Sequence, residues 1–171
     1  MSLLFNSMSL HNATTKFREE KMSVSHEEEL QRALVGLKIA PGIAIRAWQE
    51  GDFSAIQRLS EAEGWPTPVA RPEEALAGWS NSWPTLVATA DEEVVGFVRA
   101  WSDGHITTYI MELLIDAQWR QRGVGSSLLD VCHALYPRAR MEVTSTEGSA
   151  SFYRRYGFRD IGHTHRKSFV R

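Results

Sequence analysis

The chain switches between two hydrophobic periods from residue 43 onward. Short apolar runs bounded by turn residues predict strands, and apolar residues three or four apart predict amphipathic helices. The pattern predicts strands over 43–48, 85–91, 93–104, 107–116 and 139–144, and helices over 52–64, 72–82, 123–136 and 148–158. Three prolines in 65–72 predict an irregular break, and 160–170 predicts a last strand or hairpin. This order gives a mixed α/β sheet, with the apolar strand 108–116 buried on both faces near its centre.

The first forty residues lack this pattern and are interpreted as an N-terminal extension (1–40) of a domain over 41–171. Residues 1–24 show no clear period, but Ser25 and Glu28 then form a potential capping box. Apolar residues at helical spacing follow, and we expect a helix over 26–38. The extension is expected to be partly helical or flexible. It packs on the domain, packs on another subunit, as in a homodimer, or extends into solvent.

Composition and charge narrow the function classes. The chain has 171 residues, 43% of them hydrophobic, so we expect one domain with a buried core. A formal net charge of −2 provides no basic field for nucleic acid. No apolar run is long enough for a membrane span, and no secretory pattern opens the sequence. The single cysteine, Cys132, lies on an apolar helical stripe and cannot form an internal disulfide, which fits a cytoplasmic protein.

The segment RQRGVGSSLL, residues 120–129, predicts an anion-binding site. It connects the predicted strand to an amphipathic helix, whose first backbone N–H groups lack internal partners and attract negative charge. Gly123 and Gly125 have no Cβ, so a phosphate can approach the main chain. Gln121 and Arg122 add donors and positive charge. The spacing fits neither a P-loop nor the dinucleotide fingerprint, which require other residues after the glycines.

Two motifs in this order resemble a known family. LLIDAQWRQRGVGSSLL (113–129) resembles the acetyl-CoA signature of the GNAT family of N-acetyltransferases, in which a central strand leads into Q/R-x-x-G-x-G/A at the head of a helix. SFYRRYGF (151–158) is similar to the family's F-Y-x-x-x-G-F segment, and VVGFVRAWSDG (94–104) to the strand before the central one. The resemblance implies a GNAT-like α/β fold. Its mixed, mostly antiparallel central sheet is flanked by helices and splayed at the acetyl-CoA site.

The same resemblance implies acetyl-CoA as co-substrate and no metal. The central strand would bind the pantetheine arm through the main chain of Leu113, Leu114 and Ile115. The pyrophosphate would lie over the loop formed by Gln121, Arg122, Gly123, Val124, Gly125 and Ser126. An asparagine commonly stands seven residues before the family's tyrosine, and Thr146 replaces it here.

Acetyl transfer to an amine needs a group that accepts the amine proton and a group that protonates the leaving thiolate. The resemblance implies that Tyr153 is the acid. Glu112 interrupts an apolar run and is the candidate base, and by alternation it shares a face with Ile110 and Leu114. The alternative is that Glu112 is paired with Arg99. His105, in a turn, is a second candidate proton acceptor.

The acceptor is expected to lie against the first two helices of the domain. This region carries Trp65, Trp79 and Trp83 with several glutamates (Glu61, Glu63, Glu73 and Glu74), which suit a cationic amine. The first hypothesis for the acceptor is a small molecule with a primary amine, such as an aminoglycoside-like compound. A protein N-terminus or lysine is second. A catalytically silent acyl-CoA-binding or sensor domain, and an unrelated nucleotide-binding module, are the alternatives from other classes.

Overall fold

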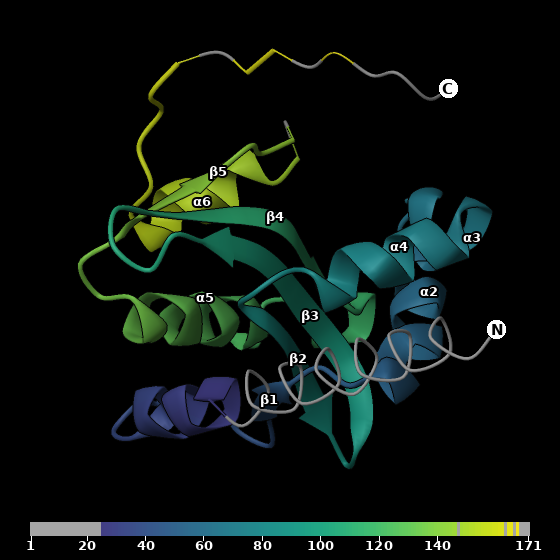
Figure 1. Ribbon diagram of the computed structural model, residues 1–171, viewed down its shortest axis with the longest axis horizontal. Helices are drawn as coiled ribbons and strands as arrows, with labels where there is room; N and C mark the ends of the chain where they lie inside the picture. Colours follow the sequence, from purple (N-terminus) through teal and green to yellow (C-terminus); the bar gives the residue numbers. More distant parts are fainter. Residues whose placement is uncertain (1–24, 147, 163, 166, 168–171) are drawn as a thin grey trace, which may run out of the picture.

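Five strands form one twisted sheet at the centre of the computed structural model, which describes residues 25–146, 148–162, 164–165 and 167 (Figure 1). The strands occur in the order in which they follow along the chain. The first four are antiparallel to one another, and the last two pair in parallel. This confirms the mixed, mostly antiparallel sheet. The strands are β1 (Ala44–Ala47), β2 (Thr85–Ala90), β3 (Glu93–Ser102), β4 (Thr107–Ile115) and β5 (Arg140–Val143).

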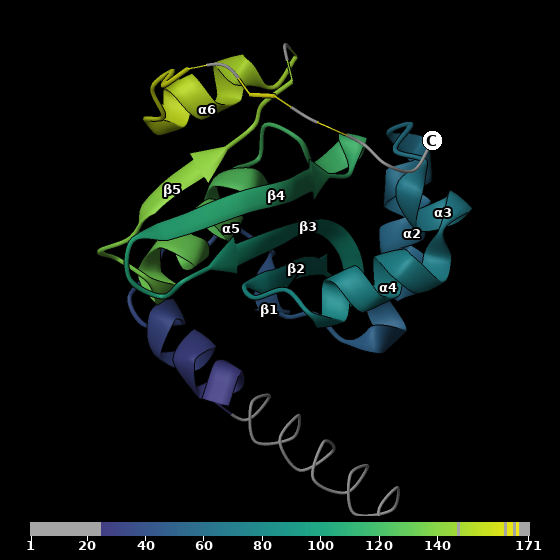
Figure 2. The same ribbon diagram turned by 45° about the horizontal axis from the view of Figure 1, so that its top comes forward.

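Helices cover both faces of the sheet (Figure 2). On one face, α2 (Phe53–Ala62), α3 (Thr67–Ala70) and α4 (Pro72–Ser80) accompany a core that includes Trp79 and Phe97. On the other, α5 (Val124–Leu135), α6 (Ala150–Tyr156) and helical residues 25–34 pack around a larger core. Two short 3-10 helices, η1 (Glu50–Asp52) and η2 (Ala117–Trp119), precede α2 and follow β4.

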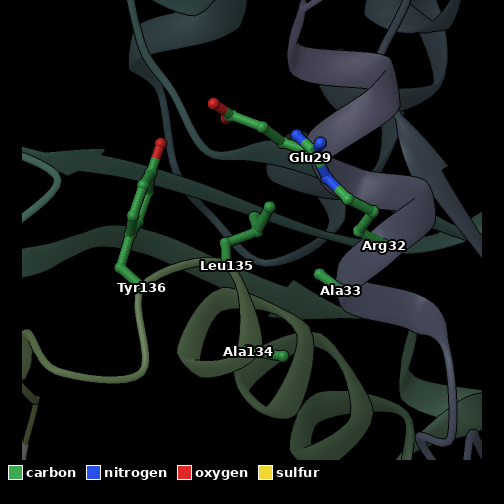
Figure 3. Close-up of a pocket in the computed structure, with 6 residues that line it drawn as sticks. All are labelled: Glu29, Arg32, Ala33, Ala134, Leu135 and Tyr136. Atoms are coloured by element: carbon green, nitrogen blue, oxygen red, sulfur yellow. The ribbon is translucent and has the colours of Figure 1, made fainter.

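The helix at 25–34 packs on the domain. Leu30 is fully buried in the core beneath α5, and Ser127 on α5 accepts a hydrogen bond of 3.0 Å from the backbone N–H of Ala40. Figure 3 shows the outer edge of this junction, where Glu29 faces Tyr136 across a shallow pocket. Burial and the nearby Glu29 carboxylate raise the pKa of the Tyr136 hydroxyl. The described part of the extension is therefore attached to the same core as the sheet.

Several predicted details are wrong. Segment 65–72, predicted to be irregular, contains α3, because proline is well tolerated in the first turn of a helix. β4 is not central: β3 occupies the middle of the sheet, and β4 lies beside the edge strand β5. β4 is also only partly buried, since Met111, Glu112 and Leu113 are half-exposed. In the described part of 158–167, no residue is in a strand.

The pairing of β4 changes halfway along its length. β3 pairs with β4 from end to end, but Arg99 lies opposite Glu112 while Ala100 lies opposite Ile110, so Met111 is an extra residue that forms a β-bulge. On the other side, β5 pairs with β4 only from Thr107 to Ile110. The predicted divergence of these two strands is confirmed. Beyond the bulge, the β5 side of β4 has no partner strand among the described residues.

The close approach of β3 and β4 opposite this open edge depends on a glycine. A Cβ at Gly96 would lie 2.6 Å from Ile115 Cδ1 and 3.0 Å from the carbonyl oxygen of Leu114. The side chain of Ile115 can rotate away, but the Leu114 carbonyl belongs to the strand itself. We expect Gly96→Ala to lower the free energy of unfolding by about 1–3 kcal/mol through overpacking, measured by urea denaturation.

The matched control is Gly51→Ala, because a Cβ at Gly51 would meet nothing within 4 Å. It should leave the unfolding midpoint nearly unchanged. Equal midpoints for the two variants would show that β4 does not need this contact.

Candidate functional site

The open half of β4 leads directly into a strained loop at the start of α5. Gln121 has φ +62° and Gly123, the N-cap of α5, has φ +85°. Both angles lie in the left-handed region, which glycine adopts without strain and glutamine does not. These turns direct the chain from η2 into the helix, so that the first N–H groups of α5 lie next to the open edge of β4. The structure thus confirms the predicted order of strand, loop and helix. The first N–H groups of α5 provide a suitable environment for an anionic group.

Gly125 also has a packing role, in addition to the phosphate contact that was predicted from the sequence. A Cβ at this position would lie 3.3 Å from Phe152 Cζ and 3.6 Å from Ile115 Cγ1. Glycine therefore allows the first turn of α5 to approach α6 and the end of β4. Gly123 has more room, since its nearest neighbour would be Ala40 Cβ at 3.7 Å. Its positive φ is the stronger reason for glycine there.

Two arginines fix the loop in different ways. Arg122 lies over the ring of Trp119, with its guanidinium carbon 5.0 Å from the ring centroid. Arg120 donates from Nε to the carbonyl of Ile115 at 3.0 Å and forms an ion pair with Glu63, just after α2. The Ile115 carbonyl thus already has a donor from within the chain. Arg120 occupies the first position of the Q/R-x-x-G-x-G motif, but no role was predicted for it from the sequence.

Glu112 is held by Arg99 in a two-point ion pair. Arg99 Nε donates to Glu112 Oε2 at 2.9 Å, and Nη2 donates to Oε1 at 3.0 Å. Only 19% of the arginine side chain and 25% of the glutamate side chain are exposed. The alternative that Glu112 is paired with Arg99 is thus correct, and the pair fixes the direction of the carboxylate.

The predicted face of Glu112 is half correct. Leu114 lies on the same face, in the core below α2 and α4, but Ile110 belongs to the core on the opposite face. The bulge at Met111 is the cause, because an extra residue interrupts the alternation of sides. As a result Glu112 points toward α4 and away from α5.

A cleft of about 180 Å³ separates β3 and β4 from α3 and α4, and Glu112 and Arg99 form one of its walls. The remaining lining residues come from the two helices and their connection: Thr67, Pro68, Arg71, Glu74, Ala75, Gly78 and Trp79. Of the two helices predicted to face the acceptor, 72–82 (α4) lines this cleft and 52–64 (α2) does not, and of the three predicted tryptophans only Trp79 is part of the lining. Trp79 is 1% exposed, Trp65 packs on its core, and Trp83 stacks on His26 from the other helical layer at 4.1 Å.

Tyr153 is a buried residue of α6 with 8% of its surface exposed. Its ring makes edge contacts with Phe152 and Phe158, at centroid distances of 5.1 and 5.4 Å. Burial raises the pKa of its hydroxyl to about 12. The neighbouring Tyr156 differs, because its hydroxyl donates to Asp130 Oδ1 at 2.6 Å. Tyr153 therefore keeps its proton at neutral pH and, among the described residues, shares it with no other side chain.

Two other residues considered in the sequence analysis, Thr146 and His105, lie outside the cleft. The backbone N–H of Thr146 donates to Ser149 Oγ at 3.1 Å, and its carbonyl accepts from Ala150, so this residue shapes the start of α6. His105 precedes β4 and lies seven residues from Glu112, about 20 Å along the strand. This distance makes it a poor proton acceptor for the same site. His163 lies outside the described residues, within which no group of three or more His, Cys, Asp or Glu residues could hold a metal.

No helix in the described segments combines the length and the hydropathy that a membrane-spanning helix needs.

Comparison with known proteins gives a consistent result. A family model described as "Acetyltransferase (GNAT) domain" matches residues 81–160, from the end of α4 to just beyond α6. No curated protein sequence gives a significant match. The matched segment contains the bulged strand, the loop before α5 and Tyr153.

Solved structures resemble the chain over most of its length. A proposed acetyltransferase from Deinococcus radiodurans R1 is 26% identical, with a TM-score of 0.61 over 77% of this chain and 92% of that one. A GNAT-family acetyltransferase from Streptococcus pneumoniae TIGR4 is 22% identical, with a TM-score of 0.61 over 75% and 98% of the two chains. An aminoglycoside acetyltransferase from an uncultured soil sample, crystallised with trehalose, is 19% identical, with a TM-score of 0.62 over 78% and 100%. The structures from Streptococcus pneumoniae and from the soil sample are less than 25% identical to this chain, so they establish the fold alone. Together with the family model, these findings show that residues 81–160 form a GNAT acetyltransferase domain and that the protein is an acyltransferase.

Proposed function

We propose that this acyltransferase moves an acetyl group from acetyl-CoA to a primary amine of a small molecule, by direct attack of the amine on the thioester. The observation that carries the proposal is the open half of β4, which runs into the anion-binding loop of α5 on one side and borders the cleft with Glu112 on the other. A thioester bound along the strand edge and an amine bound in the cleft would therefore meet at β4.

The proposed binding of acetyl-CoA uses main-chain groups. Backbone groups of Leu113, Leu114 and Ile115 on the open edge would bind the pantetheine arm, although the Ile115 carbonyl already accepts from Arg120. The N–H groups at the start of α5, from Gly123 through Val124 and Gly125 to Ser126, would bind the pyrophosphate. Gln121 and Arg122 would contribute side-chain donors and charge.

The proposed chemistry follows from two side chains. Glu112, oriented by Arg99, accepts a proton from the acceptor ammonium directly or through a water molecule, and the neutral amine attacks the thioester carbon. A C–N bond forms, the C–S bond breaks, and the nitrogen of the new amide loses its second proton to water. Tyr153 donates its proton to the leaving thiolate, a role supported by the burial that keeps this hydroxyl protonated.

The cleft supports a small acceptor over a protein. A volume of about 180 Å³ is below the roughly 300–1,000 Å³ of pockets that hold drug-sized ligands. A protein N-terminus or lysine side chain remains the second candidate acceptor, and assays with peptides would detect it. The buried single cysteine supports a reducing compartment such as the cytoplasm.

The loop before α5 should be essential for acetyl-CoA affinity. Gly125→Glu introduces a negative charge at the proposed pyrophosphate site and a side chain against Phe152, so we expect calorimetric affinity to fall by more than about tenfold. Gly125→Ala is the control for packing alone, since its Cβ meets only the Phe152 ring and Ile115. A folded Gly125→Glu variant with unchanged affinity would refute the proposed cradle.

Tyr153→Phe should slow acetyl transfer and leave acetyl-CoA affinity nearly intact. The hydroxyl acts only on the developing thiolate, so the loss belongs to the chemical step. General acid catalysis is worth about 10²- to 10⁴-fold, and single-turnover transfer measures it directly. Tyr156→Phe on the same helix is the matched control, and it should keep the wild-type rate. A Tyr153→Phe rate within about threefold of wild type would leave Tyr153 as a packing residue only.

Glu112→Gln should lower kcat/KM for the amine most strongly near neutral pH. At higher pH more of the acceptor is already neutral, so the need for a base decreases and the deficit should shrink. The measurement is a pH profile of kcat/KM from 7 to 10. Glu142→Gln, an acid on β5 paired with Arg140, is the control. A deficit that stays constant with pH would argue against proton acceptance by Glu112.

A further inference from the structure

The charged side chains of the acceptor cleft are balanced in sign. Two arginines and two glutamates line it, namely Arg71, Arg99, Glu74 and Glu112. A site for a polycation requires an excess of carboxylates, because several ammonium groups must each find a negative partner. This cleft offers one positive group for every negative group, and its other lining residues are mostly apolar or small.

The two ion pairs of the cleft differ in strength. Arg99 and Glu112 form two hydrogen bonds and are mostly buried, and Arg99 Nη1 also approaches Ser82 Oγ at 3.3 Å and Met111 Sδ at 3.4 Å. This pair is fixed. Arg71 and Glu74 are one turn apart around the start of α4, with 40% and 64% of their side chains exposed. Exposed pairs of this kind contribute little to stability, so a ligand carboxylate can replace Glu74 as the partner of Arg71.

We infer that the acceptor is zwitterionic, carrying a carboxylate close to the amine that is acetylated, as a free α-amino acid does. This inference rests on the proposed function and names its substrate class. The ammonium lies at Glu112, next to the open half of β4. The carboxylate lies at Arg71, where a guanidinium can bind it through two parallel hydrogen bonds.

A glycine keeps the cleft open between these two ends. Gly78 lies in the last turn of α4, two residues before its end, and glycine is a weaker helix former than alanine. A Cβ there would meet only Arg99 Nη1, at 3.9 Å. A larger side chain would extend over the fixed ion pair and occupy the space assigned to the acceptor. Helix α4 thus carries a glycine, a weak helix former, at the position where its backbone lines the cleft.

The test compares matched acceptors with the purified full-length chain and saturating acetyl-CoA. Leucine, methionine and phenylalanine are each compared with the amine that lacks the carboxylate and with the corresponding carboxamide. An aminoglycoside serves as the polycationic acceptor. We expect kcat/KM to be about 10- to 100-fold higher for at least one amino acid than for its two analogues, the effect of a hydrogen bond to a charged group.

Variants then assign the carboxylate site. Arg71→Gln should reduce the preference for the amino acid over its two analogues to less than threefold. Arg32→Gln, the same change on the N-terminal helix, should preserve the preference. Gly78→Leu should lower kcat/KM for all acceptors without changing acetyl-CoA affinity, whereas Gly78→Ala should retain most of the activity and a normal fold.

These outcomes distinguish a failure of this inference from a failure of the proposed function on which it rests. If decarboxylated amines or the aminoglycoside are acetylated as well as any amino acid, the zwitterionic class is wrong while acetyl transfer to an amine stands. If Arg71→Gln leaves the preference unchanged, the carboxylate does not bind at Arg71. If acetyl-CoA binds but no amine is acetylated, the proposed function fails together with the inference.

Discussion

The β-bulge at Met111 is the feature on which the rest of the site depends. An extra residue in β4 changes which side chains face each side of the sheet, and the pairing with β5 ends one residue earlier, at Ile110. The same strand therefore presents unpaired backbone at its edge and a carboxylate on its face. Without the bulge, Glu112 would point into the core below α5, where no arginine of β3 could meet it. The bulge thus places Glu112 on the side of the cleft lined by α3 and α4, in the stretch of β4 that has no pairing with β5.

The two helical layers serve these two sides separately. α5 and α6 carry the turn proposed to bind the pyrophosphate and the buried tyrosine, while α3 and α4 line the cleft proposed for the acceptor. Arg120 connects them, since it binds the end of β4 and forms an ion pair with Glu63 next to α2. A second ion pair, between Arg58 on α2 and Asp116 after β4, joins the same two regions.

Sequence patterns predicted the features that arise locally. The loop at 120–126 and helix α5 follow from two glycines and an apolar stripe, and neither needs knowledge of distant residues. The face of Glu112 could not be predicted by alternation, because the bulge depends on how β3 and β4 pair. The tryptophans were misassigned for a similar reason: Trp79 and Trp83 pack on different layers, although they are four residues apart. Prolines concealed α3, since they start a helix as readily as they interrupt one.

The buried cysteine has a practical consequence for any study of this enzyme. Cys132 is fully buried in α5, and burial raises the pKa of its thiol to about 12, so almost no thiolate forms at neutral pH. Because the chain has no other cysteine, the folded protein should be unreactive toward disulfide reagents and mild oxidants. A chromogenic thiol reagent added during turnover would therefore react with the released coenzyme alone, and continuous colorimetric assays would have almost no protein background.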